Sequence, residues 1–145
     1  MNIKRVFASK AGIEALIIRV PVGVIFAAHG AQKLFGWFGG YGLEGTGQWM
    51  ASQGFTPGFL MALMAGSAEF FGGIALILGL LTRPAAILTA FTMLMAMTVH
   101  VSNGLFLSNN GYEFALSLLA VTTSIVFMGG GKFALDNIIE TTLNN

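Results

Sequence analysis

The sequence contains no cysteine, and only 9% of its 145 residues are charged. Without cysteine, this chain has no disulfide, no cysteine-ligated iron–sulfur cluster and no thiolate zinc site. Soluble domains carry about 25% charged residues, so these charges are too few to cover a surface that faces water. The net charge of +1 gives no basic excess of the kind that nucleic-acid binding requires. We therefore expect a lipid bilayer as the surroundings and no nucleic-acid partner.

Hydrophobic residues make up 55% of the chain and gather in four long runs. A membrane-spanning helix needs about 20 largely apolar residues. A soluble bundle would show polar residues at every third or fourth position, and the run 85–99 has none more polar than threonine. The sequence therefore predicts an all-α fold, an integral membrane four-helix bundle with up–down topology. It forms a single domain over 1–145, with spans at about 13–35, 58–81, 84–101 and 112–128.

Local signals mark several ends of these runs. Pro84 fits the first turn of a helix, where its missing N–H costs nothing. Three glycines at 129–131 should end the fourth run, because glycine is a common helix C-cap. Glu14 and Arg19 interrupt the first run, which is also too long for the apolar part of a signal peptide, so we expect a retained helix.

The basic residues outside the runs predict the orientation. With four spans, five of them lie on one side: Lys4, Arg5, Lys10, Arg83 and Lys132. The two long loops on the other side, 36–57 and 102–111, contain neither lysine nor arginine. Because positive residues stay cytoplasmic, we expect a multi-pass protein of the bacterial inner membrane with both termini in the cytoplasm.

The first long loop, 36–57, is rich in glycine and aromatic residues. Its aromatic rings suit the headgroup layer, so the loop could act as an interfacial anchor. The alternative is a lid over a cavity that opens outward. Thr46 is predicted to cap a short helix over 48–53.

Ionisable residues interrupt the apolar runs at positions where they are costly. In the first run, five residues at spacings of three and four share one face of the expected helix: Arg19, Val22, Phe26, His29 and Lys33. Arg19 lies about 9 Å from the expected helix start and can lower the cost of its charge by snorkelling to the cytoplasmic side. Glu69 lies about 17 Å into the second run, near the bilayer midplane. It should therefore face inward and be paired, wetted or protonated. A purely structural bridge to Arg19 or His29 is the alternative to a functional role.

The third run ends at His100, and the fourth begins beside Glu113. Antiparallel threading places five ionisable residues in or near the outer half of the bundle: His29, Lys33, Glu69, His100 and Glu113. We predict that they meet in one outward-opening polar chamber and act as ligand-binding or proton-transfer residues, with no catalytic residue assigned. The alternative is that Lys33, His100 and Glu113 are ordinary charges at helix ends.

Two kinds of metal site are disfavoured. A copper-binding row of methionines would need its sulfur atoms on one face of the helix, and Met95 points away from Met93 and Met97. Haem between His29 and His100 would require matching depths, which these positions lack. We therefore predict no metal site and treat the methionines as packing residues.

Small residues predict close helix contacts. Gly23 and Gly30 are seven apart on the first run, as are Gly66 and Gly73 on the second. Close approach of helices in lipid depends on such residues.

Five segments together resemble the DoxX family of small bacterial inner-membrane proteins. They are HGAQKLFGWFGG (29–40), AEFFGGIALILGLLTRPAA (68–86), His100, GYE (111–113) and GGGKFALD (129–136). The resemblance implies a four-helix membrane bundle and an oxidoreductase connection. Some members are similar to subunits of a thiosulfate:quinone oxidoreductase, and others are linked to defence against oxidative or thiol-directed stress. It supports functional roles for His29, Lys33, Glu69, His100 and Glu113, whereas Arg19, Arg83 and Asp136 are expected to serve structure, topology or capping.

Three functions follow as hypotheses. The first is an oxidoreductase-linked membrane subunit that binds a quinone or a similar small molecule, with no intrinsic cofactor evident and a redox protein as partner. The second is a small proton-coupled transporter built around Glu69. The third is a membrane scaffold that holds a soluble redox enzyme through the amphipathic tail 132–145. The oligomeric state is left open.

Overall fold

The computed structural model describes residues 4–144, with side chains from 6 to 142, and within that part all regular structure is helical. The all-α prediction is confirmed. The α-helices are α1 (Lys4–Phe7), α2 (Ile13–Phe35), α3 (Gly42–Ser52), α4 (Gly58–Leu78), α5 (Thr82–His100), α6 (Glu113–Met128) and α7 (Leu135–Asn144). Three short 3-10 turns are η1 (Trp37–Gly39), η2 (Val101–Asn103) and η3 (Leu107–Asn109).

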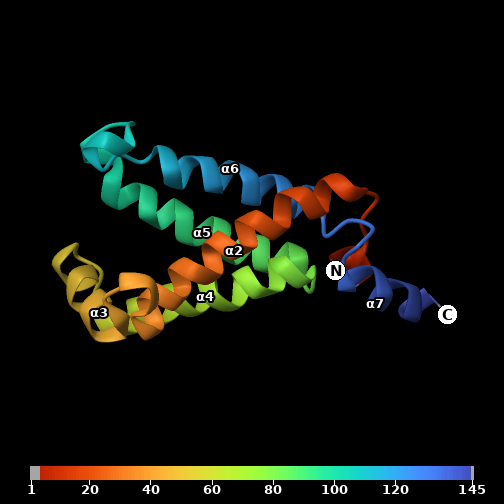
Figure 1. Cartoon of the computed structure of the whole chain (residues 1–145), viewed down its shortest axis with the longest axis horizontal. Coiled ribbons are helices and arrows are strands. Elements are labelled where there is room, and N and C mark those ends of the chain that lie inside the picture. The colour runs from red at the N-terminus through yellow and green to blue at the C-terminus, as the bar shows by residue number, and fades with distance from the viewer. Residues whose placement is uncertain (1–3, 145) are drawn as a thin grey trace.

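The long helices run along the long axis of the molecule (Figure 1). α2 packs against α4, α4 against α5, and α5 against α6. One end, here the loop end, carries α3 and the connection 101–112. The opposite end, here the terminal end, carries α1, α7 and both ends of the chain.

Within the described residues, three helices are long and apolar enough to cross a membrane: α2, α4 and α5 with its continuation to Asn103. α6 is also apolar but has 16 residues. At 1.5 Å per residue it is about 24 Å long, shorter than the hydrocarbon core of about 30 Å. Large apolar side chains on the outside of these helices, such as Phe71 and Phe91, are exposed and would face lipid.

The second and third predicted spans have different boundaries in the structure. α4 ends at Leu78, not at residue 81, because Gly79 takes a left-handed conformation that ends the helix. α5 begins at Thr82, two residues before Pro84. Pro84 therefore lies in the first turn, where its missing N–H needs no partner inside the helix.

The prediction for Thr46 is wrong. α3 begins at Gly42, so Thr46 lies inside the helix and is buried instead of capping a helix over 48–53. α3 is held against the start of α4 at a very close approach. A Cβ added to Gly58 would lie 2.0 Å from the carbonyl oxygen of Gly47.

The predicted close contact of small residues is confirmed between α2 and α4. A Cβ added to Gly30 would lie 2.3 Å from the backbone nitrogen of Phe70. One added to Gly73 would lie 2.4 Å from the nitrogen of Ala27. No side chain fits at either position without moving the helices apart.

Arg19 does not snorkel as expected. It is 1% exposed and donates hydrogen bonds to four backbone carbonyls, those of Leu76, Ile77, Gly130 and Phe133. Two of these acceptors lie in the last turn of α4, where carbonyls lack partners inside the helix and a cation is favoured. Arg19 therefore joins the end of α4 to the segment between α6 and α7.

Two further charged side chains tie the terminal end together. Asp136 is buried, and its carboxylate accepts hydrogen bonds from the backbone N–H groups of Leu81 (2.7 Å) and Thr82 (2.9 Å). It thus caps the start of α5 from the other end of the chain. Arg83 donates to the carbonyls of Val126 and Phe127 at the end of α6, and to Ala8. The side chains of Lys4 and Arg5 lie outside the described part.

Candidate functional site

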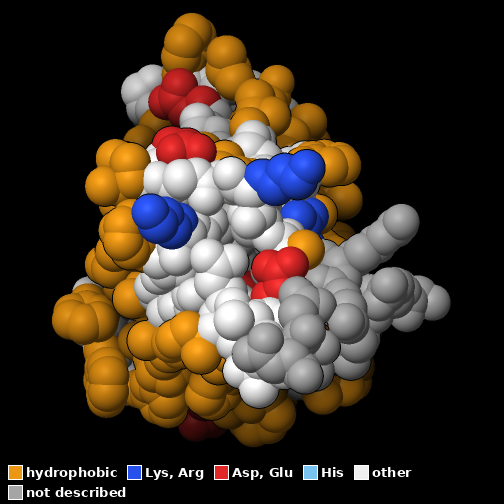
Figure 2. All heavy atoms as spheres, turned by 90° about the vertical axis from the view of Figure 1, so that its right-hand side faces the viewer, with side chains coloured by type: hydrophobic (Ala, Val, Ile, Leu, Met, Phe, Trp, Pro, Cys, Tyr) orange, Lys and Arg blue, Asp and Glu red, His pale blue; other side chains and the backbone are white. Residues whose placement is uncertain are grey.

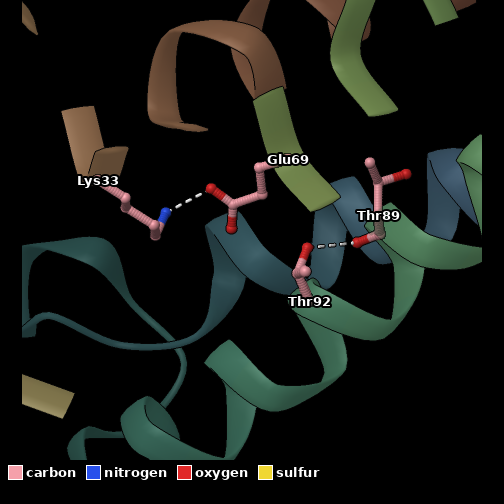
Figure 3. Close-up of polar contacts among 4 residues, drawn as sticks. All are labelled: Lys33, Glu69, Thr89 and Thr92. Atoms are coloured by element: carbon pink, nitrogen blue, oxygen red, sulfur yellow. Dashed lines mark hydrogen bonds and ion pairs between the residues drawn. The ribbon is translucent and has the colours of Figure 1, made fainter. Parts of the chain in front are cut away.

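Lys33 and Glu69 form an ion pair between α2 and α4, with Lys33 Nζ donating to Glu69 Oε2 (Figure 3). The Glu69 side chain is 3% exposed and that of Lys33 is 24% exposed. The expectation that Glu69 faces inward and is paired is confirmed. Its partner is Lys33, so the alternatives of a bridge to Arg19 or His29 are wrong.

Glycine positions the two helices so that this pair can form. Gly66 precedes Glu69 by three residues on the buried face of α4. A Cβ added to Gly66 would lie 3.2 Å from Lys33 Cβ and 2.8 Å from a methyl of Leu34. The missing side chain lets α2 lie close to α4 at this level, and Lys33 then reaches the carboxylate one turn further along α4.

α5 packs against α4 close to Glu69, because a Cβ added to Gly72 would lie 2.9 Å from Thr89 Cγ2. Figure 3 shows the Glu69 carboxylate directed at Lys33, with Thr92 and Thr89 on the neighbouring helix α5. Both threonine hydroxyls bond to carbonyls of their own helix: Thr89 to Ala85 (2.9 Å) and Thr92 to Thr89 (2.8 Å). Sequence reasoning did not single out these two buried polar residues, because it treated threonine as part of an apolar run. Their spacing of three, which places both on one face, was the available signal.

A hollow of about 470 Å³ lies beside the pair at the loop end. It is lined by Gln32, Lys33, Gly39, Gly40, Tyr41, Gly45, Thr46 and Trp49. Lys33 is the wall residue that connects this hollow to the buried Glu69. The loop 36–57, which was predicted to be an anchor or a lid, includes α3. Together they form one wall of the hollow beside the Lys33–Glu69 pair.

His29 lies one turn before Lys33 on α2 and is half-buried. Its ring is tilted by 50° against Phe114 of α6, at 5.7 Å between ring centroids. Among the described hydrogen bonds, none joins His29 to Lys33 or Glu69. The His29 side chain therefore packs against α6, one helical turn from Lys33.

His100 and Glu113 belong to a different part of the loop end. Glu113 accepts a hydrogen bond from the backbone N–H of Leu107 (2.6 Å), so it orders the connection between α5 and α6. His100 ends α5, and its Nδ1 is buried without a hydrogen-bond partner in the described structure. The structure thus joins Lys33 and Glu69 directly, while no described hydrogen bond or ion pair links His100 or Glu113 to them.

Arg19, Arg83 and Asp136 lie at the terminal end, where they bond to helix ends as described above. Over the described residues, no three of the His, Asp and Glu side chains come together as a metal site would require. The strongest arrangement for chemistry is therefore the Lys33–Glu69 pair beside its hollow.

A family model described as DoxX matches residues 15–101. The chain belongs to the DoxX family. The matched region runs from the first turn of α2 to the end of α5 and therefore contains both members of the ion pair. The resemblance seen in the sequence is confirmed.

Curated proteins from three bacteria are similar to this DoxX chain over most of its length. "Inner membrane protein YqjF" of Escherichia coli is 31% identical, covering 88% of this chain and 93% of its own. "Putative oxidoreductase CatD" of Bacillus subtilis is 32% identical, covering 88% and 87%. An uncharacterized protein of Haemophilus influenzae is 36% identical, covering 83% and 86%. No solved structure matches the chain.

Together with its three helices of spanning length, these relatives establish the location. This DoxX-family chain is a multi-pass protein of the bacterial inner membrane, in contact with the lipid bilayer. The predicted location is confirmed.

Proposed function

We propose that this DoxX-family protein is an oxidoreductase-linked membrane protein that binds a quinone or a similar small molecule in the hollow at the loop end. The observation that carries the proposal is the Lys33–Glu69 pair. The carboxylate of Glu69 is buried between helices, and the side chain of Lys33 lines a hollow of ligand size. A relative named "Putative oxidoreductase CatD" supports the redox part of the proposal.

The residues around the hollow fit a quinone headgroup. Its carbonyl oxygens need hydrogen-bond donors, and the wall offers the Lys33 ammonium, the Gln32 amide and the Tyr41 hydroxyl. Trp49 and Tyr41 also offer flat aromatic faces that suit a planar ring. Donors and aromatic faces on the same wall are what binding and orienting such a ring require.

Glu69 gives the site a place to hold a proton. A bound quinone would supply two-electron chemistry that also consumes protons, and charge left in lipid is costly. Lys33 joins Glu69 to the hollow, so the pair can pass a proton between the interior and a ligand on the wall. The sequence offers no electron carrier of its own, and a redox protein or a diffusible reductant would supply the electrons.

We also propose that α6 is a fourth span, so that α2, α4, α5 and α6 form an up–down bundle with both termini cytoplasmic. Lys10, Arg83 and Lys132 support this orientation because they belong to the terminal end. The hollow beside Lys33 would then open on the outer side of the membrane. α6 would cross by local thinning of the bilayer at its ends.

A site open on one side is favoured over an alternating-access transporter. Buried hydrogen bonds of Arg19 and Asp136 hold the terminal end closed, and an inward-open state would have to break them. A scaffold that acts only through its tail would have no use for the buried pair. We therefore rank transport and scaffolding below ligand binding.

Co-purification of quinone tests the proposal. Purified wild-type protein should release quinone into organic solvent, and the variants Lys33→Ala and Glu69→Gln should release much less. Lys132→Ala and Glu44→Gln are matched controls at exposed positions outside the hollow, and should retain wild-type levels. If folded wild type carries no quinone, or if all four variants carry the same amount, the proposal is refuted.

A further inference from the structure

A second hollow lies at the terminal end, away from the Lys33–Glu69 pair. It measures about 520 Å³, within the range of about 300–1,000 Å³ that is typical of small-molecule sites. Its walls come from residues 8–11 before α2, from the start of α5, from the end of α6 and from α7. Three charged residues line it: Lys10, Arg83 and Glu140.

Within the described part of the chain, no ion pair joins any two of these three charges. The ion pair found among the described side chains is Lys33–Glu69, so none joins Glu140 to Lys10 or Arg83. The terminal nitrogens of Arg83 are held by backbone carbonyls, and its Nε is buried with no acceptor from the described protein. Among the described side chains, the wall of the hollow thus carries two cations and a carboxylate that are not paired with one another, which suits a ligand that carries both signs of charge.

The hollow also lies where a membrane lipid would meet the protein. Figure 2 shows this end of the molecule, with basic and acidic side chains gathered on it and hydrophobic side chains around them. Phe127 and Met128, in the last turn of the apolar helix α6, line the hollow, and Phe127 is 78% exposed. A ligand held here would therefore have its charged part at the helix ends and an apolar part beside α6.

We propose that this hollow binds the headgroup of an aminophospholipid. Its phosphate would lie against Lys10 and Arg83, and its primary ammonium would donate to the Glu140 carboxylate. Basic pockets at the ends of membrane helices bind lipid phosphates, and the carboxylate adds the selectivity. An anionic lipid without an amine leaves Glu140 unpaired, and a choline headgroup has no N–H to donate. This site is independent of the function proposed for Lys33 and Glu69.

Native mass spectrometry of the full chain in detergent tests the proposal. Three lipids with identical acyl chains are added separately: phosphatidylethanolamine, phosphatidylglycerol and phosphatidylcholine. Phosphatidylethanolamine should bind about fivefold more tightly than the other two, as one additional charge contact near a membrane surface predicts. Equal binding of the three lipids, or preference for phosphatidylglycerol, would overturn the proposal.

Two variants separate the roles of the charges. Lys10→Gln should weaken phosphatidylethanolamine and phosphatidylglycerol alike, by about fivefold. Glu140→Gln should remove the preference for phosphatidylethanolamine over phosphatidylglycerol. The exposed residues Lys132 and Glu44, changed to glutamine, serve as controls and should bind as wild type does. A preference that survives Glu140→Gln would overturn the assignment.

Soluble phosphorylethanolamine distinguishes a lipid from a free phosphate ligand. It carries the same two charges without acyl chains, so it should compete only weakly with the lipid. If it binds as tightly as phosphatidylethanolamine, the hollow is a site for a soluble phosphate compound and the lipid assignment is wrong.

Discussion

Removing one member of the Lys33–Glu69 pair should cost more stability than removing the other, because the two side chains differ in burial. Glu69 is 3% exposed, whereas Lys33 is 24% exposed and lines the hollow. Lys33→Met leaves a carboxylate between helices without a cation, and breaking a buried pair in this way costs about 3–5 kcal/mol. Glu69→Gln leaves an ammonium that can turn into the hollow, and we expect a loss of about 1 kcal/mol, as for one hydrogen bond.

The double variant gives the sharpest form of this prediction. Once Glu69 is glutamine, Lys33→Met removes a cation that no longer has a partner, and should cost less than about 1 kcal/mol. The coupling energy between the two positions should therefore be about 2–5 kcal/mol. This asymmetry separates a buried pair from a surface pair, in which both single variants would cost similar small amounts.

The free energy of unfolding can be measured by denaturant titration in mixed micelles, with Trp37 and Trp49 as fluorescent reporters. Lys132→Met and Glu44→Gln are matched controls at exposed positions, and each should change the free energy by less than about 0.5 kcal/mol. Equal losses in Lys33→Met and Glu69→Gln, or a coupling energy near zero, would show that Lys33 and Glu69 do not form a buried, asymmetric pair.

Three further predictions concern packing, the terminal end and orientation. Gly30→Ala should lower the free energy of unfolding by about 1–3 kcal/mol, because the added methyl would lie 2.3 Å from the nitrogen of Phe70; an unchanged unfolding curve would contradict the close approach. Arg19→Lys should lower the melting temperature strongly, since an ammonium cannot reach all four carbonyls that the guanidinium holds; wild-type stability would show that these bonds matter little. In cells, a membrane-impermeant maleimide should label Tyr41→Cys but not Lys132→Cys, and the reverse pattern would invert the proposed topology.

Hydropathy and spacing predicted the helices well because both are local properties of the chain. The range 13–35 matches α2 without change, and the glycines at 129–131 end α6 as expected. Boundaries failed where distant residues decide them. The start of α5 depends on Asp136, a carboxylate 54 residues away in sequence from Thr82. No local pattern contains that contact.

The sequence predicted the residues of the site, but not which of them form an ion pair. The cost of a charge in lipid singled out Glu69, and the spacing on α2 placed Lys33 and His29 on one face. Which residue reaches Glu69 depends on how closely α2 and α4 approach, and that is set by Gly66 and Gly30. Arg19 was misjudged because backbone carbonyls, which carry no sequence signal, are its partners.

We propose that the Lys33–Glu69 pair serves a ligand in the hollow at the loop end. Titration with a water-soluble, short-chain quinone tests it, because Trp49 lines the hollow and Trp37 does not. Quenching of tryptophan fluorescence should saturate in wild type and in Trp37→Phe, and should be lost in Trp49→Phe. Lys33→Ala should raise the half-saturating concentration about tenfold, as expected for loss of one charge-assisted hydrogen bond. Quenching that never saturates, or that is unchanged in Lys33→Ala, would show that Lys33 does not bind a quinone in this hollow.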